Sequence, residues 1–327
     1  MKAWQVTRNA APREALELAE VDRPRPGPGQ LLVRVSAGAL NFPDVLLCLG
    51  QYQIRPPLPF TPGLELCGRV EGLGEGVEGW NAGERVIGNP ILPGGSFAEY
   101  VLMDATDTFR APASLGDEAA ASLHIAYQTA YVGLHRRAHI QPGETLLVHA
   151  GAGGVGSAAV QVGKAAGARV IAVVGGPHKA DAAAKLGADL VIDRRAQDFV
   201  KEVKEATGGR GADVVFDPVG GDAYTGSTKC VAFEGRILVV GFAGGSVPAP
   251  ALNHALVKNY SIVGLHWGLY REKDPAQVAA AHDALTAMAA TGAVAPLIGG
   301  RLTMDEVPEG LTRLAAGDTV GRLVLVL

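Results

Sequence analysis

The fold of this chain is decided by the stretch Leu146-Leu147-Val148-His149-Ala150-Gly151-Ala152-Gly153-Gly154-Val155-Gly156. It joins an apolar run to a G-x-G-x-x-G turn, and an amphipathic segment rich in alanine and valine follows over residues 157–166. A second apolar run, 168–174, comes next. Strand, glycine turn, helix and strand in this order are typical of the first βαβ unit of a dinucleotide-binding fold.

The glycines of this turn have separate expected roles. Gly151 permits the tight turn, Gly153 lets a pyrophosphate approach the backbone, and Gly156 lets the helix pack closely on the strand. The helix N-terminus offers free N–H groups and a partial positive charge to phosphates. We therefore expect the cofactor to be bound by Gly153, Gly154, Val155 and Gly156.

The tip of the second strand indicates which dinucleotide binds. An NAD-preferring unit usually places Asp or Glu about 20 residues past the glycines, but here the strand ends at Gly175-Gly176 without a carboxylate. The small Gly175 and the nearby cation of Lys179 suit a 2′-phosphate, and Arg194 and Arg195 could close on the same group. The alternative for each cation is an ordinary solvated charge. The pattern predicts NADPH.

Composition sets the class of protein. The chain has 327 residues, long enough for two domains, with 48% hydrophobic and 19% charged residues. A net charge of −4 gives no support to nucleic-acid binding. No apolar run approaches the roughly 18 residues of a membrane span, and the N-terminus has no signal-peptide pattern. The expected location is the cytoplasm.

The three cysteines, Cys48, Cys67 and Cys230, stand far apart and form no C-x-x-C pair. An odd, scattered set argues against a disulfide framework and against a structural zinc site. The sequence therefore predicts buried free thiols in a reducing compartment.

The pattern of predicted secondary structure changes near residue 117. The preceding residues are β-rich, with short alternating runs separated by proline and glycine. A helical segment follows to about residue 137, and apolar runs then alternate with helical segments, which predicts a doubly wound parallel sheet. We expect its strands at residues 146–149, 170–174, 190–192, 214–216, 237–240 and 262–265. A helix over 275–291 and a strand over 322–327 close the chain.

Several short motifs together resemble one family. They are residues 41–46 (NFPDVL), 50–52 (GQY), 59–65 (PFTPGLE), 152–156 (AGGVG), 186–189 (LGAD) and 213–220 (DVVFDPVG). In this combination, which covers essentially the whole chain, the sequence resembles the zinc-independent quinone oxidoreductase branch of the medium-chain dehydrogenase/reductase superfamily.

The resemblance implies an α/β protein with a GroES-like β-rich lobe and a Rossmann lobe with a doubly wound parallel sheet. We expect the first lobe over residues 1–122 and 272–327 and the NADPH-binding lobe over 123–271. It also implies a homodimer joined through the last Rossmann strand, at about residues 261–267.

Zinc-dependent relatives bind a catalytic zinc through a Cys, a His and a further ligand. Here the matching positions look like Asn41 and Leu64, and the four-Cys structural zinc lobe has no counterpart near residues 89–96. Because leucine cannot bind a metal, polarisation of an alcohol or carbonyl by zinc is not expected. No metal-binding residue is predicted.

Hydride transfer without zinc needs an acceptor that is already electrophilic, such as a quinone or a conjugated enone. The best candidate for a proton donor is Tyr52, because the family's enoyl reductases have a tyrosine in the matching segment. A second tyrosine found in several quinone reductases is replaced here by Val45 or Leu46. The alternative for Tyr52 is a packing residue of the cleft wall.

Further site residues follow from the resemblance and from the ends of strands. Asn41, the second catalytic candidate, would bond the nicotinamide ribose or the substrate, unless it is a turn residue before Pro43. Thr129 would contact the carboxamide, unless its hydroxyl bonds its own helix. Val219, Gly241 and Phe242 follow strand ends, where the ligand crevice is expected.

The resulting hypothesis is an NADPH-dependent reductase that acts on a quinone or another activated double bond. An enoyl-thioester reductase is the first alternative. A non-catalytic nucleotide-binding member of the family is the second, although the intact glycine motif and Tyr52 favour an enzyme.

Overall fold

The computed structural model describes residues 1–327, which divide into two compact units. Unit 1 comprises Met1–Ile125 and Pro296–Leu327, and unit 2 comprises Ala126–Ala295. The second boundary lies later in the chain than the predicted 271/272. The reason is that α11 (Pro275–Ala290) packs against α10 (Gly268–Lys273), and both backbone groups of Ala295 bond the Gln161 amide at 2.6 and 3.1 Å.

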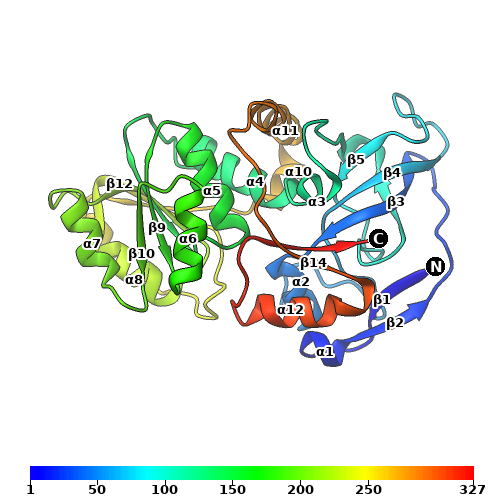
Figure 1. The fold of residues 1–327 in the computed structure, drawn as a ribbon, viewed down its shortest axis with the longest axis horizontal. Coiled ribbons are helices and arrows are strands. Elements are labelled where there is room, and N and C mark those ends of the chain that lie inside the picture. The colour runs from blue at the N-terminus through cyan, green and yellow to red at the C-terminus, as the bar shows by residue number, and fades with distance from the viewer. The chain divides into compact units, whose positions relative to one another are not determined.

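Unit 2 is built on a six-stranded parallel sheet with the strand order β10-β9-β8-β11-β12-β13 (Figure 1). The order reverses between β8 and β11, and ligands of doubly wound sheets bind at the carboxyl ends of strands near such a switch point. All six predicted strands are present, so the predicted Rossmann sheet is confirmed. The strands are β8 (Thr145–His149), β9 (Arg169–Val174), β10 (Leu190–Asp193), β11 (Ala212–Asp217), β12 (Val231–Val239) and β13 (Ser261–Gly264).

Helices connect these strands and cover both faces of the sheet. The helices α5 and α6 lie on one face, and α7 and α8 lie on the other (Figure 1). All five residues of β8 are buried, as expected for a parallel strand covered on both sides. The helices are α4 (His124–Tyr131, which begins in unit 1), α5 (Gly154–Ala165), α6 (Pro177–Lys185), α7 (Phe199–Ala206), α8 (Gly221–Cys230) and α9 (Leu252–Lys258).

The segment predicted as one helix over 117–137 is broken in the structure. It forms α3 (Asp117–Ala121), then α4, then a π-helical turn over Val132–Arg137. At the first break the hydroxyl of Ser122 donates to the carbonyl of Glu118 at 2.9 Å, and such side-chain bonds compete with helix continuation. None of the helices is long and apolar enough to cross a membrane. All three cysteines are buried free thiols.

Unit 1 contains a seven-stranded sheet ordered β14-β15-β3-β4-β5-β7, with β6 paired to β3. This is the GroES-like lobe, and β15, near the end of the chain, lies between β14 and β3. A separate two-stranded ribbon is formed by β1 (Lys2–Val6) and β2 (Leu16–Glu20). The main strands are β3 (Gln30–Ala39), β4 (Leu66–Leu73), β5 (Arg85–Gly88), β6 (Tyr100–Asp104), β7 (Thr108–Arg110), β14 (Ile298–Leu302) and β15 (Arg322–Val326).

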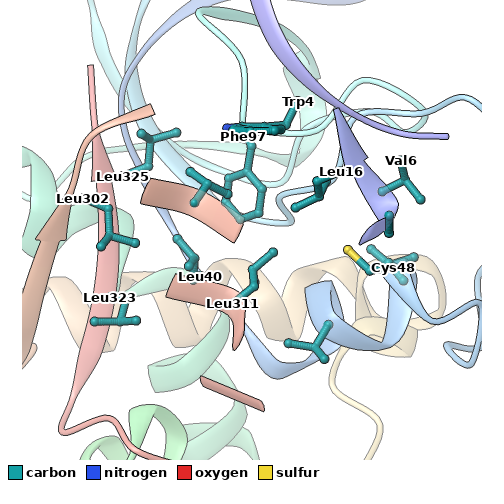
Figure 2. Close-up of a cluster of buried hydrophobic side chains, with 14 of the residues drawn as sticks. Trp4, Val6, Leu16, Leu40, Cys48, Phe97, Leu302, Leu311, Leu323 and Leu325 are labelled. Atoms are coloured by element: carbon teal, nitrogen blue, oxygen red, sulfur yellow. The ribbon is translucent and has the colours of Figure 1, made fainter. Parts of the chain in front are cut away.

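One hydrophobic cluster of unit 1 joins the two ends of the chain (Figure 2). It packs side chains of β1 and of α2 (Phe42–Cys48) against those of β15 and of α12 (Val307–Ala315). The short helix α1 (Pro12–Ala15) contributes Ala15. Because α2 is held by this cluster, the residues at its two ends have fixed positions.

Candidate active site

The glycine turn has the geometry of a phosphate-binding loop, with one difference from the prediction. The left-handed residue of the turn is Ala150, with φ 52°, and not Gly151. A Cβ on Gly151 would lie 2.8 Å from the Cβ of Ala172 on β9, and one on Gly156 would lie 2.1 Å from the carbonyl oxygen of Ala150. Both positions therefore need glycine because neighbouring backbone or side-chain atoms approach so closely.

Gly153 is different, because a Cβ there would meet only Ala150 of its own turn. It is the N-cap of α5, and the partly exposed Gly154 and Val155 form the first turn of this helix. The first amides of a helix have no partners within it. The backbone at Gly153, Gly154, Val155 and Gly156 is thus suited to an anionic group.

The tip of β9 is surrounded by nitrogen-bearing side chains. A Cβ on Gly175 would lie 3.4 Å from a terminal nitrogen of Arg194, so this guanidinium covers Gly175. A Cβ on Gly176 would lie 3.3 Å from Arg195 and 3.6 Å from the ring of His178. Three nitrogen-bearing side chains therefore gather at the glycine pair, and β9 itself ends without a carboxylate, so the nearest one is that of Asp193 from β10.

Asp193, at the end of β10, fixes the shape of this corner. Its Oδ1 accepts hydrogen bonds from the backbone N–H groups of Gly176 at 2.9 Å and Arg195 at 3.0 Å. These bonds hold the pKa of the Asp193 carboxyl below its ordinary value. Lys179 lies in the first turn of α6 and is half-buried.

The ends of β11 and β12 meet at the same edge of the sheet. The N–H of Val219 bonds Oδ1 of Asp217 at 2.8 Å, and the N–H of Gly241 bonds the Asp217 carbonyl at 3.4 Å. The ring of Phe242 covers Gly220, where a Cβ would be 2.8 Å from the ring. The predicted Val219, Gly241 and Phe242 are thereby brought together, and Phe242 is 38% exposed.

Thr129 lies in α4 and is 9% exposed. Its hydroxyl can both donate and accept a hydrogen bond, as contact with a carboxamide would require.

In unit 1, Asn41 belongs to a buried polar network. Its Oδ1 accepts from the Arg322 guanidinium at 2.9 Å, and its Nδ2 donates to Glu65 Oε1 at 3.0 Å and to the Ala39 carbonyl at 3.2 Å. The guanidinium of Arg322 also bonds Glu65 Oε1, and Glu65 Oε2 accepts from the N–H of Ile125 at 2.8 Å. Glu65 is fully buried, and burial raises the pKa of its carboxyl against the opposing effect of Arg322.

Asp44 has a structural role at the start of α2. Its Oδ2 accepts from the backbone N–H of Asn41, the N-cap of α2, at 2.8 Å, and its Oδ1 accepts from Gly63 at 3.2 Å. Burial raises the pKa of Asp44 to about 7. The carboxyl thus ties the start of α2 to the loop before β4.

Tyr52 lies beyond the other end of α2. It is half-buried and packs against the hydrophobic cluster of Figure 2. The seven-residue α2 spans about 10 Å, so the two predicted catalytic residues lie at opposite ends of this helix.

The donor set does not fit a bound zinc ion. No group of three His, Cys, Asp or Glu side chains is arranged to hold a metal. Leu64 packs against the hydrophobic cluster, and the amide of Asn41 is taken up by Arg322 and Glu65.

Two residues of the site were not foreseen as ligands or partners. His178 could have been noticed from its position two residues after Gly176. Arg322 could not be found from the sequence, because it lies 257 positions after Glu65 and only the pairing of β15 with β3 brings the two together.

Together, the GroES-like sheet, the parallel sheet and its glycine turn define the class of nucleotide-dependent medium-chain oxidoreductases. Two family models match the chain: "Alcohol dehydrogenase GroES-like domain" over residues 27–113 and "Zinc-binding dehydrogenase" over residues 154–287. The quinone oxidoreductase-like protein 2 homolog of Nematostella vectensis is 37% identical, over 91% of this chain and 82% of the relative. The chain belongs to the quinone oxidoreductase branch of the medium-chain dehydrogenase/reductase superfamily, a family of oxidoreductases.

Two solved structures resemble this chain over nearly its full length. The Escherichia coli quinone oxidoreductase complexed with NADPH has a TM-score of 0.92 and 29% identity, with all of both chains covered. The CurK enoyl reductase has a TM-score of 0.89 and 26% identity, covering 99% of this chain and 98% of its own.

Proposed function

We propose that this protein is an NADPH-dependent oxidoreductase that reduces a quinone or another α,β-unsaturated carbonyl compound without zinc. The observation that carries the proposal is the corner at Gly175 and Gly176. There, Arg194, Arg195 and His178 surround a glycine pair where an NAD site would have a carboxylate. The NADPH bound to the related E. coli enzyme supports the same cofactor.

The residues present fit this cofactor. Gly153 offers an open backbone beside the N-terminus of α5 for the pyrophosphate. Arg194, Arg195 and Lys179 offer cations for the 2′-phosphate, and charge-assisted bonds of this kind are the strong ones. Thr129 offers a hydroxyl to the carboxamide, and Val219, Gly241 and Phe242 lie at the strand ends.

Bound NADPH supplies the hydride for the reduction. On the acceptor side, the hydroxyl of Tyr52 is assigned to donate a proton to the enolate formed from an enone. An enone or quinone is electrophilic without a Lewis acid, which agrees with the absence of a metal-binding side-chain group.

A cofactor titration followed by an acceptor panel tests the proposal. Quenching of protein fluorescence should report NADPH binding at least tenfold tighter than NADH binding. NADPH oxidation should then be faster with small quinones and enones than with saturated aldehydes or ketones. Equal use of saturated ketones would contradict the proposed acceptor class.

A second candidate is an enoyl-thioester reductase, favoured by the likeness to the CurK enoyl reductase. The same panel separates the two, because an enoyl-thioester reductase should prefer a crotonyl thioester to the corresponding free enone. A substrate-binding preference for the thioester would replace the quinone assignment without changing the cofactor.

We also propose that the protein forms a homodimer through β13. This strand is the edge of the parallel sheet, and its Ser261 and Ile262 are exposed. Unpaired edge strands readily pair with another chain. Size-exclusion chromatography with light scattering should give twice the chain mass of 33.7 kDa.

A further inference from the structure

Unit 2 has a pocket that the proposed reaction does not use. Its volume is about 290 Å³, and its wall includes Gly211, directly before β11, and Val231, the first residue of β12. Because the strands of this sheet are parallel, their starts lie at one edge and their ends at the other. The pocket therefore lies at the edge opposite to the glycine turn and the other predicted cofactor residues.

Four cationic side chains line this pocket, and no carboxylate does. Lys204, Lys229 and Lys258 lie in the last turns of α7, α8 and α9. Arg210 lies in the loop before β11, and its guanidinium is paired with the carboxylate of Asp213. The three lysines form no ion pair, so three uncompensated positive charges line one pocket.

The helix ends explain only part of this arrangement. A cation in the last turn of a helix interacts favourably with the partial negative charge there, and Nζ of Lys258 donates to the Thr228 carbonyl of α8 at 2.7 Å. This accounts for each lysine separately, but not for three of them in one pocket. Partial burial and the charge of Lys204 lower the pKa of Lys258. A bound anion would relieve the repulsion between these two ammonium groups.

The rest of the wall offers an aromatic ring. The backbone N–H groups of Gly209 and Gly211 are already bonded, to the Lys204 carbonyl at 2.7 Å and to Oγ1 of Thr207 at 2.9 Å, so side chains must supply the donors. The side chain of Phe233 lines the same pocket and is 70% exposed. A planar heterocycle can stack on such a ring.

We propose that this pocket binds a nucleoside diphosphate. The three lysines bind its phosphates, and the ring of Phe233 stacks on its base. A nucleoside diphosphate carries about three negative charges near pH 7, which matches the three unpaired lysines. Lys258 can take part because an ammonium group has three donors and Thr228 uses one of them. The site is separate from the proposed reaction and does not depend on which acceptor is reduced.

Calorimetric titration of ADP and of pyrophosphate into the protein saturated with NADP⁺ tests this site. The NADP⁺ keeps both compounds away from the glycine turn. One ADP per chain should bind with a Kd below about 1 mM, and ADP should bind more tightly than pyrophosphate because only ADP has a base.

Lys204→Glu/Lys229→Glu reverses two exposed charges of the pocket. A charge-assisted bond contributes about 10-fold or more to Kd, so we expect both compounds to bind about 100-fold more weakly. Lys185→Glu/Lys201→Glu is the matched control, because it changes the net charge equally at exposed positions outside the pocket. The control should change neither Kd by more than about threefold, the scale expected of screened surface charges.

Phe233→Ala tests the assignment of the base. It should weaken ADP binding by about fivefold or more and leave pyrophosphate binding unchanged. NADPH affinity should be unaltered in every variant, which shows that the variants are folded. Three results would each contradict the site: no binding of ADP beside NADP⁺, equal weakening in the control, or an unchanged preference for ADP over pyrophosphate in Phe233→Ala.

Discussion

The guanidinium of Arg194 lies against the backbone of Gly175, within 3.4 Å of the place where a side chain would begin. Gly175 does not have a positive φ, so a substitution there causes no backbone strain. The pair therefore offers a direct way to change the cofactor preference.

Gly175→Asp should shift the preference from NADPH towards NADH. The new carboxylate would pair with Arg194 and repel a 2′-phosphate, and it could accept from the ribose 2′-hydroxyl of NADH. We expect NADPH binding to weaken by about 100-fold, the scale of about 3 kcal/mol. Ratios of kcat/KM for the two cofactors measure the shift, and an unchanged ratio would place the 2′-phosphate elsewhere.

Arg194→Ala and Lys179→Ala should each weaken the binding of NADPH and leave the binding of NADH nearly unchanged. A charge-assisted bond is worth roughly 1.5–3 kcal/mol, or about 10- to 150-fold in Kd. Because Arg194 covers Gly175, we expect Arg194→Ala to weaken NADPH binding more than Lys179→Ala does. Lys185→Ala, at the exposed end of α6, is the control. Equal losses for both cofactors would defeat the assignment.

Tyr52→Phe should lower turnover on enones by about 10²- to 10⁴-fold, the usual scale of general acid catalysis. NADPH affinity should hardly change. Turnover on quinones should fall less, since the oxygen of the reduced quinone can take its proton from water. Tyr100→Phe, on β6, where the ring contacts Arg23 at 4.0 Å, serves as the control. Full enone activity in Tyr52→Phe would show that Tyr52 is a packing residue and not the proton donor.

Exhaustive chelation should leave turnover unchanged, because the side chains present do not form a metal site. Elemental analysis should find less than one zinc per chain. A bound zinc whose removal abolishes turnover would contradict the zinc-independent mechanism.

His149 should make stability fall on acidification. Burial lowers its pKa to about 4 from an ordinary 6.5, so the folded state binds fewer protons than the unfolded state between these values. The contribution of His149 to the free energy of unfolding is full above pH 6.5. It declines by about 3 kcal/mol as the pH falls to 4. Urea unfolding at several pH values should show a flatter profile for His149→Gln than for the unaltered protein.

The exposed His266 provides the control for this measurement. His266→Gln should keep the slope of the unaltered protein between pH 6.5 and 4. Parallel profiles for His149→Gln and the unaltered protein would show that His149 does not carry this dependence.

The sequence predicted what depends on local pattern. Six strands, the glycine turn and the absence of a carboxylate after β9 follow from periodicity and from the chemistry of single positions. It assigned the turn to Gly151, although the left-handed residue is Ala150, because a pattern of glycines does not show which one is required by packing and which by conformation.

The polar network of unit 1 could not be predicted from local sequence patterns. Asn41, Glu65 and Arg322 come from three distant segments, and only the register of β15 on β3 brings the third to the first two. Asn41 was predicted as a site residue from its motif, but the orientation of its amide depends on Arg322, which no spacing rule connects to it. The boundary near residue 295 was missed for the same reason, since it depends on the contact between Gln161 and Ala295.

The interior place of β15 has a consequence for biosynthesis. Unit 2 is continuous in sequence, so it can fold while the chain is still being made, because domains generally fold as units during synthesis. The end of β3 at residues 37–39 must stay unpaired on one side until residues 322–326 have emerged from the ribosome, because β6 covers only residues 30–34. Arg322 is the first residue of that strand. A nascent or truncated chain that stops short of it therefore has an open, aggregation-prone sheet edge and an uncompensated buried carboxylate at Glu65.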